Sequence, residues 1–129
     1  MIRVTEMDHI VLRVADVERS LAWYQQRLGL EGVRVEEFRR EEVFFPSLRI
    51  DQHTLIDLVG GEAPTGAGGN LDHFCLVVAP GSLDEVDADH GFEVVDEGER
   101  FGARGDARSK YVLDPDGNVV ELRTYPYAG

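Results

Sequence analysis

Apolar side chains fill five of the eight positions of residues 7–14 (MDHIVLRV), and this run, rich in Ile, Leu and Val, predicts a β-strand. Apolar residues then recur at helical spacing over residues 17–28, with Asp16 placed as the N-cap and Gly29 as the residue that ends the helix. Three more apolar runs, separated by polar turns, predict strands over residues 33–38, 43–50 and 54–59. The first half of the chain is therefore predicted to be strand–helix–strand–strand–strand.

The second half repeats this order. Residues 71–78 (LDHFCLVV) predict a strand, Ser82 is placed as the cap of a short acidic helix to about His90, and residues 92–95 return to extended structure. A Gly- and Arg-containing stretch over residues 100–109 is predicted to be irregular. Strands follow over residues 110–113 and 119–124, with a tight turn at DPDGN between them. The Gly-rich segment 60–70 is too polar for a core, so it is predicted to link a module of about 1–60 to one of about 71–129.

Composition narrows the class of protein. At 129 residues, with 43% hydrophobic and 29% charged residues, the chain is predicted to be one globular domain, 1–129, made of these two modules. The net charge of −12 repels phosphate groups, so neither nucleic acid nor an anionic membrane surface is an expected partner. No leader or membrane-length apolar run is evident, and the single cysteine excludes an internal disulfide. We expect a soluble, cytoplasmic protein in which Cys75 is a buried and inert thiol.

The two halves also align side chain by side chain. An offset of 64 positions places His9 on His73 in the first strand of each half, and Asp57 on Glu121 in the last. Strand alternation puts these four side chains on one face, opposite the apolar residues that pack under the helices. Any one of them alone is more typical of a hydrogen-bonded histidine or of the wet face of a strand. Together, two imidazoles and two carboxylates predict a site for a divalent metal ion such as Zn²⁺, Ni²⁺, Fe²⁺ or Mn²⁺, with room left for water or substrate.

At these residues the sequence resembles the vicinal oxygen chelate superfamily, which includes glyoxalase I, bleomycin and fosfomycin resistance proteins, methylmalonyl-CoA epimerase and extradiol dioxygenases. The resemblance covers nearly the whole chain and is carried by MDHIVLRVADVERSLAWYQQRLGL, LDHFCLVV and YVLDPDGNVVEL. It implies an α+β fold of two βαβββ modules, whose curved mixed sheets form an open metal-binding cleft, and often a homodimer. By this likeness His9, Asp57, His73 and Glu121 match the metal positions. Asp57 departs from the usual Glu or Gln and, one methylene shorter, reaches less far.

The same resemblance implies a lyase or isomerase of the glyoxalase I type, which depends on a divalent ion (Ni, Zn, Co, Mn or Fe). Its substrate would be a small α-hydroxycarbonyl or a thiol adduct, converted through an enediolate. Glu121 is expected to be both ligand and catalytic base, with Asp57 as the second candidate, and a role for Glu121 as ligand alone stays open. Two alternatives remain: an Fe²⁺ extradiol-type dioxygenase, because two His and one carboxylate suit Fe²⁺, and a non-catalytic drug-binding protein of the bleomycin-resistance type.

Five further residues are candidates for binding a small-molecule substrate: Arg13, Phe101, Arg104, Arg108 and Tyr111. Arg13 shares a strand face with His9, where a guanidinium can grip a carboxylate, and a surface ion pair is the alternative. Arg104 and Arg108 would clamp an anion from the Gly-containing stretch, unless that stretch is a solvated loop. The two aromatic residues, Phe101 and Tyr111, would line the cleft or pack in the core.

Overall fold

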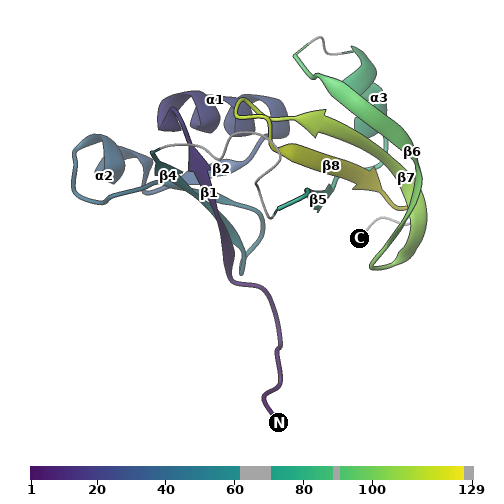
Figure 1. The fold of residues 1–129 in the computed structure, drawn as a ribbon, viewed down its shortest axis with the longest axis horizontal. Coiled ribbons are helices and arrows are strands. Elements are labelled where there is room, and N and C mark those ends of the chain that lie inside the picture. The colour runs from purple at the N-terminus through teal and green to yellow at the C-terminus, as the bar shows by residue number, and fades with distance from the viewer. Residues whose placement is uncertain (62–70, 89–90, 127–129) are drawn as a thin grey trace. The chain divides into compact units, whose positions relative to one another are not determined.

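A computed structural model describes residues 1–61, 71–88 and 91–126 of the chain (Figure 1). The chain divides into two compact units, Met1–Gly66 and Ala67–Gly129, and each unit has a sheet of its own. The predicted linker lies almost wholly outside the described residues, as does His90.

The first unit contains β1 (His9–Val14), α1 (Val17–Leu28), β2 (Glu31–Val33), α2 (Val35–Arg39), β3 (Ser47–Arg49) and β4 (Leu55–Gly60). Its strand order is β1-β4-β3-β2, in which β1 and β4 are parallel and the other pairs antiparallel. As predicted, Asp16 caps α1 by accepting the Arg19 N–H at 3.1 Å, and Gly29 ends the helix at a left-handed φ of 68°. The strand predicted over residues 43–50 is shorter, because it begins after Pro46, which has no N–H to pair.

The strand predicted over residues 33–38 is wrong, since β2 ends at Val33 and the chain continues into helix α2. Arg34, between them, has a left-handed φ of 60°, which turns the backbone away from the sheet. Arg39 then pairs with Glu36 one helical turn earlier at 3.1 Å and with Glu18 of α1 at 2.8 Å. The alternation of Val, Phe and charged residues in this stretch resembles a strand, but the charge pairs are made by a helix.

The second unit contains β5 (Phe74–Val77), α3 (Ser82–Ala88), β6 (Val94–Gly102), β7 (Gly105–Leu113) and β8 (Val119–Thr124). Its order is β5-β8-β7-β6, with β5 parallel to β8, so the first strand again lies beside the last. Apart from α2, each unit follows the order strand–helix–strand–strand–strand. The predicted α+β fold with two mixed sheets is confirmed.

The irregular segment predicted over residues 100–109 is also wrong, because β6 and β7 form a long hairpin closed by a two-residue turn. Gly105 has a φ of 101°, a conformation that glycine adopts without strain. At Gly102 the reason is space: a Cβ there would come within 1.7 Å of the Arg123 guanidinium, which reaches across from β8 to two carbonyls of β6. Gly102 thus allows the close approach of a side chain and Gly105 allows the tight turn, so the two glycines do not mark an irregular loop.

The DPDGN turn between β7 and β8 is confirmed. The Asp114 carboxylate accepts the backbone N–H of Asp116 at 2.9 Å and that of Asn118 at 2.8 Å. Gly117 supplies the positive φ, 82°, that the turn requires. The turn therefore sets the register in which β7 and β8 pair.

Each core lies between one face of a sheet and a helix. The buried apolar residues of the first unit are Leu12, Val14, Leu21, Tyr24, Leu48, Ile56 and Leu58, and those of the second include Leu83, Val86, Val112, Val120 and Leu122. Helix α1 packs on β4 and α3 on β8, so the opposite face of each sheet is left for polar side chains. No helix in the described part of the chain is long and apolar enough to cross a membrane.

The one lysine of the sequence, Lys110 on β7, lies on the helix-facing side of the second sheet and is fully buried. Its ammonium donates to the carbonyl of Leu83 in α3 at 3.2 Å, contacts the carboxylate of Asp87, and lies 3.9 Å from that of Glu97. The charge is thus compensated where α3, β6 and β7 meet.

Candidate metal centre

The first unit brings His9 of β1 and Asp57 of β4 together, with 3.8 Å between Nε2 and Oδ2. The other ring nitrogen, Nδ1, donates to the carboxylate of Asp8 at 2.7 Å, which fixes the tautomer and leaves the Nε2 lone pair facing Asp57. Ser47, directly opposite Asp57 in β3, donates its hydroxyl to Oδ1 at 2.6 Å. Both functional side chains are therefore oriented by a second residue.

The electrostatics at His9 favour a cation. The hydrogen bond to Asp8 and the charge of Asp57 raise the pKa of His9 above its usual value, since both carboxylates stabilise a positive ring. The same two carboxylates would stabilise a metal cation at Nε2, where it would take the place of the proton.

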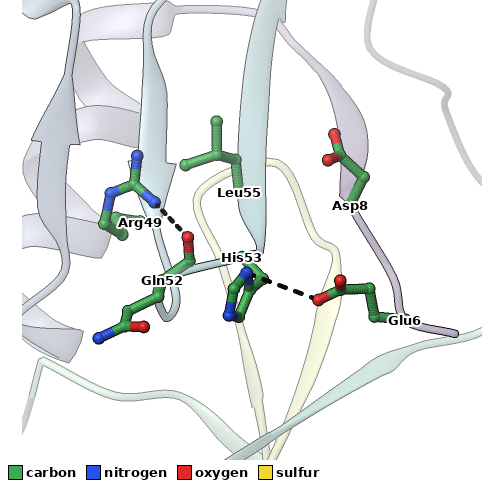
Figure 2. Close-up of a pocket in the computed structure, with 6 residues that line it drawn as sticks. All are labelled: Glu6, Asp8, Arg49, Gln52, His53 and Leu55. Atoms are coloured by element: carbon green, nitrogen blue, oxygen red, sulfur yellow. Dashed lines mark hydrogen bonds and ion pairs between the residues drawn. The ribbon is translucent and has the colours of Figure 1, made fainter.

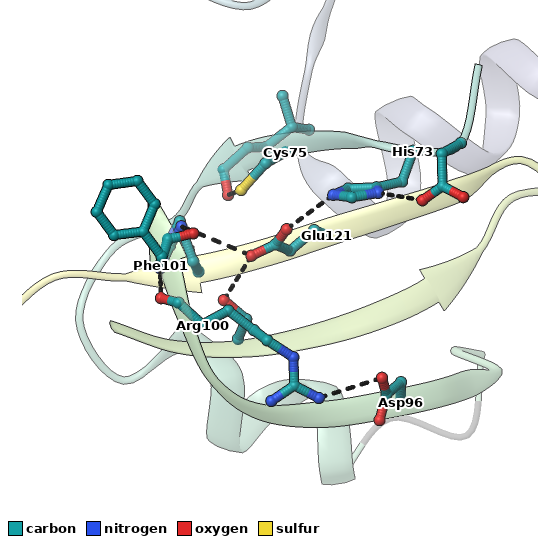
Figure 3. A network of polar contacts seen from close by, with 10 residues as sticks. His73, Cys75, Asp96, Arg100, Phe101 and Glu121 are labelled. Carbon is teal, nitrogen blue, oxygen red and sulfur yellow. Dashed lines mark hydrogen bonds and ion pairs between the residues drawn. The ribbon is translucent and has the colours of Figure 1, made fainter. Parts of the chain in front are cut away.

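The second unit repeats this arrangement 64 positions later (Figure 3). The Nε2 atom of His73 lies 3.1 Å from Oε1 of Glu121, and Nδ1 donates to the carboxylate of Asp72 at 2.7 Å. The Ser109 hydroxyl donates to Oε2 of Glu121 at 2.6 Å. Each unit therefore has an aspartate–histidine–carboxylate–serine chain. We call the two predicted metal ligands of each chain the first pair (His9 and Asp57) and the second pair (His73 and Glu121).

More side chains orient the second pair than the first. Tyr111, directly opposite Glu121 in β7, hydrogen-bonds to its carboxylate and places its ring edge-on to His73, with 5.4 Å between ring centroids. The Arg123 guanidinium lies 3.7 Å from the same carboxylate. Burial alone would raise the pKa of Glu121, but the hydrogen bonds from Ser109 and Tyr111 and the charge of Arg123 outweigh it, so the pKa is lowered. Glu121 is thus held as an anion.

The donor atoms of each pair suit a metal ion. Two ligands at right angles, each about 2.1 Å from one cation, lie about 3 Å apart. The second pair matches this separation at 3.1 Å, and the first pair, with its shorter Asp57, is wider at 3.8 Å. Within residues 1–61, 71–88 and 91–126, no group of three or more His, Cys, Asp or Glu side chains is arranged to hold a metal ion. That all four ligands meet at one ion therefore stays a prediction.

The other predicted residues are spread over both units. Arg13 is exposed on the same face of β1 as His9, and Phe101 of β6 is 84% exposed. Arg104 lies in the hairpin turn, 5.3 Å from the Tyr125 ring. Arg108 neighbours Ser109 in β7, so strand alternation directs it to the opposite face of the sheet from Glu121. Of the five substrate candidates, Tyr111 is the one that the structure places against a predicted ligand.

The prediction that Cys75 is buried is wrong, because it lies on the edge strand β5, on the exposed face that also carries His73. Partial loss of hydration around the thiol and the charge of Glu121 raise the pKa of Cys75 to about 12. The thiol therefore stays protonated at neutral pH and is a weak nucleophile, as expected.

Asp8 also lines a pocket of about 340 Å³ in the first unit, at the bend between β3 and β4 (Figure 2). The other lining residues are Glu6, Arg49, Gln52, His53 and Leu55. Nδ1 of His53 lies 3.6 Å from the Glu6 carboxylate, and Arg49 donates to the carbonyl of Gln52 at 3.4 Å. These polar groups are paired with one another, and His9 is not among the residues that line the pocket.

Apart from Tyr111, which was predicted to line the cleft, the supporting residues of both pairs were missed in the sequence, although a signal for several exists. Asp8 and Asp72 are the first letters of the repeated Asp-His doublet, and Ser47 and Tyr111 are related by the same offset of 64. Ser109 has no such counterpart, because it reaches Glu121 from a position two residues before Tyr111 in β7. The repeat therefore predicts the supporting residues that the two units share, but it does not predict Ser109, which has no counterpart in the first unit.

We expect Ser47→Ala to weaken metal binding by about tenfold, in the range typical of groups that orient a metal ligand. Ser109→Ala should have a smaller effect, because Glu121 keeps Tyr111 and Arg123 as partners. Competition with a chelating dye would measure both dissociation constants. Equal effects, or a larger loss for Ser109→Ala, would show that the two carboxylates are supported alike.

A family model described as the Glyoxalase/Bleomycin resistance protein/Dioxygenase superfamily matches residues 6–122. The chain belongs to this superfamily. The match covers both pairs and all strands of the two sheets apart from the last two residues of β8.

Known proteins are similar to the chain over most of their length. Virulence protein STM3117 of Salmonella typhimurium is 30% identical over 126 residues, which cover 95% of this chain and 85% of that protein. An integron cassette protein from V. cholerae has the same fold with a TM-score of 0.71 at 26% identity, over 97% of this chain and 98% of the other. The fosfomycin resistance protein FosX of Listeria monocytogenes matches with a TM-score of 0.67 at 20% identity, over 98% and 96%, which shows a common fold alone.

Proposed function

We propose that the chain is a divalent-metal-dependent lyase or isomerase of the glyoxalase I type, which acts on a small α-hydroxycarbonyl or a thiol adduct. The observation that supports this best is the repeated pair, in which Nε2 of a histidine and an oxygen of a carboxylate face each other and are each oriented by a further residue. The ion would be held by His9, Asp57, His73 and Glu121. A divalent cation in this position would stabilise the negative charge that develops on two neighbouring substrate oxygens.

The side chains of the chain itself have two tasks in such a reaction. Asp8 and Asp72 keep the Nδ1 atoms protonated, so that each Nε2 remains a ligand. A carboxylate must also take a proton next to the substrate carbonyl and return it to the adjacent carbon, and Glu121 and Asp57 are the candidates for this base. The two pairs complete one ligand set either within a chain or between the chains of a homodimer, and in both cases the expected stoichiometry is one ion per chain.

An Fe²⁺ extradiol-type dioxygenase is the second candidate. The wider spacing of the first pair, 3.8 Å, makes Asp57 the weakest of the four ligands. Without it, His9, His73 and Glu121 form the set of two His and one carboxylate that is typical of non-haem Fe²⁺ oxygenases.

The test is to strip the protein of metal and titrate it with Ni²⁺, Co²⁺, Zn²⁺, Mn²⁺ and Fe²⁺, with each form assayed on a methylglyoxal–thiol adduct and on catechol. We expect one ion per chain and turnover of the thiol adduct. Oxygen consumption with catechol, confined to the Fe²⁺ form, would favour the dioxygenase instead. Failure to take up any of the five ions would contradict both enzymes and favour a metal-free, drug-binding protein.

A further inference from the structure

Arg100 of β6 lies on the face of the second sheet that carries Glu121. It pairs in register with Ala107, and alternation along β7 places Ala107 and Tyr111 on the same face. The Arg100 guanidinium is 5.9 Å from the centre of the Tyr111 ring, and Tyr111 is hydrogen-bonded to Glu121. The Tyr111 ring therefore lies between the Arg100 guanidinium and the second pair.

Several features of the fold hold Arg100 in this position. Arg123 donates to the carbonyl of Arg100 itself and, at 3.2 Å, to that of Phe101, which fixes the backbone of β6 at this point. The side chain then turns back across Gly98, where a Cβ would come within 2.2 Å of Nη1, so the glycine leaves the room that the guanidinium fills. Nη2 is 3.2 Å from the carboxylate of Asp96, and the guanidinium also donates to backbone carbonyls of β6.

The ion pair between Arg100 and Asp96 adds little to the stability of the fold. The Arg100 side chain is 38% exposed and that of Asp96 is 61% exposed, and ion pairs between such exposed groups contribute little to folding. The Arg100 guanidinium can, however, exchange Asp96 for another partner, because water and dissolved anions reach both exposed groups. A guanidinium offers two parallel N–H donors to a carboxylate, which makes it a good receptor for that group.

The charge of the whole chain makes a local cation important for binding. With a net charge of −12, the molecule repels anions unless positive side chains are concentrated at the site. Arg100 and the buried Arg123 supply that concentration on the same face as Glu121.

We propose that Arg100 binds a carboxylate of the substrate, so that the site selects anionic α-hydroxycarbonyl compounds or anionic thiol adducts. This inference rests on the proposed function, because it assumes that the two neighbouring oxygens of the same substrate lie at the second pair. Asp96 holds the guanidinium until the substrate carboxylate replaces it.

The test uses two probes that share two neighbouring oxygens and differ in charge, 3,4-dihydroxybenzoate and the neutral 3,4-dihydroxybenzamide. Binding to the Co²⁺-loaded chain is measured by calorimetry, and the visible spectrum of Co²⁺ reports separately whether the oxygens reach the ion. We expect the benzoate to bind about tenfold more tightly than the amide, as for a charge-assisted pair. Arg100→Gln should abolish this preference, and Arg100→Lys should keep part of it.

Arg108→Gln is the matched control, because it removes the same charge from the same hairpin but on the opposite face of the sheet. It should leave the preference unchanged. Equal binding of the two probes to the unaltered chain would overturn the inference, as would a preference that survives Arg100→Gln. The proposed function would still stand if both probes changed the Co²⁺ spectrum.

A chain that takes up no Co²⁺ would instead contradict the proposed function. The same probes are then compared by calorimetry on the metal-free protein, in the unaltered chain and in Arg100→Gln. A preference for the benzoate that Arg100→Gln removes would support the anion site by itself, and its absence would exclude it.

Discussion

Replacing His73 with alanine should abolish tight metal binding by the whole chain, and His9→Ala should do the same. If the two pairs share one ion, the loss of either imidazole removes a ligand from the same coordination shell. We expect the affinity to fall by at least about a hundredfold in each variant, more than is typical for residues that only orient a ligand. Equilibrium dialysis with Ni²⁺ or Zn²⁺ would give both the affinity and the stoichiometry, which should be one ion per chain before substitution.

His53→Ala is the control for this experiment, since that imidazole lies in the bend between β3 and β4 and faces Glu6 at 3.6 Å. Its removal should leave metal binding unchanged. Two ions per chain, with His73→Ala losing one and keeping the other at its original affinity, would show that each unit binds an ion alone. That result would contradict the shared site.

Lys110→Ala should destabilise the protein by about 3 kcal/mol, whereas Lys110→Met should cost about 1 kcal/mol. The alanine variant leaves a cavity between α3 and β7, because the lysine side chain is fully buried. Methionine fills most of that volume. The carboxylates of Asp87 and Glu97 are 55% and 59% exposed, so water can replace the ammonium as their partner in either variant. Urea unfolding followed by circular dichroism would measure both changes.

The comparison of the two lysine variants separates packing from charge. If Lys110→Met were as unstable as Lys110→Ala, the ion pairs with α3 and β6 would be the main contribution of this residue. A neutral result for both would mean that α3 is held by its apolar side chains, Leu83 and Val86, without help from the lysine.

The sequence was sufficient to predict the structure wherever the local residue chemistry and the tertiary structure agree. Asp16 and Gly29 predicted the two ends of α1 because a cap depends on a few neighbouring residues. The offset between the halves placed His9 beside Asp57 and His73 beside Glu121, since in each unit the first and last strands are parallel neighbours.

The predictions failed where a distant residue decides the local structure. The stretch after Val33 alternates like a strand, but it becomes a helix that is held to α1 by Arg39 and Glu18. Gly102 is typical of a loop in sequence, yet in the structure it makes room for Arg123, which is 21 positions later in the chain. Such a contact leaves no trace in periodicity or in turn composition.

The unequal support of the two carboxylates has an evolutionary consequence. A duplication produces two halves that begin under the same constraint, but here Asp57 relies on the hydroxyl of Ser47, whereas Glu121 is held by Ser109, Tyr111 and Arg123 together. A substitution of Ser109 leaves Glu121 held by Tyr111 and Arg123, whereas a substitution of Ser47 removes the hydroxyl on which Asp57 relies. The first half should therefore evolve more slowly around its carboxylate, even though the second half contains the more elaborate site.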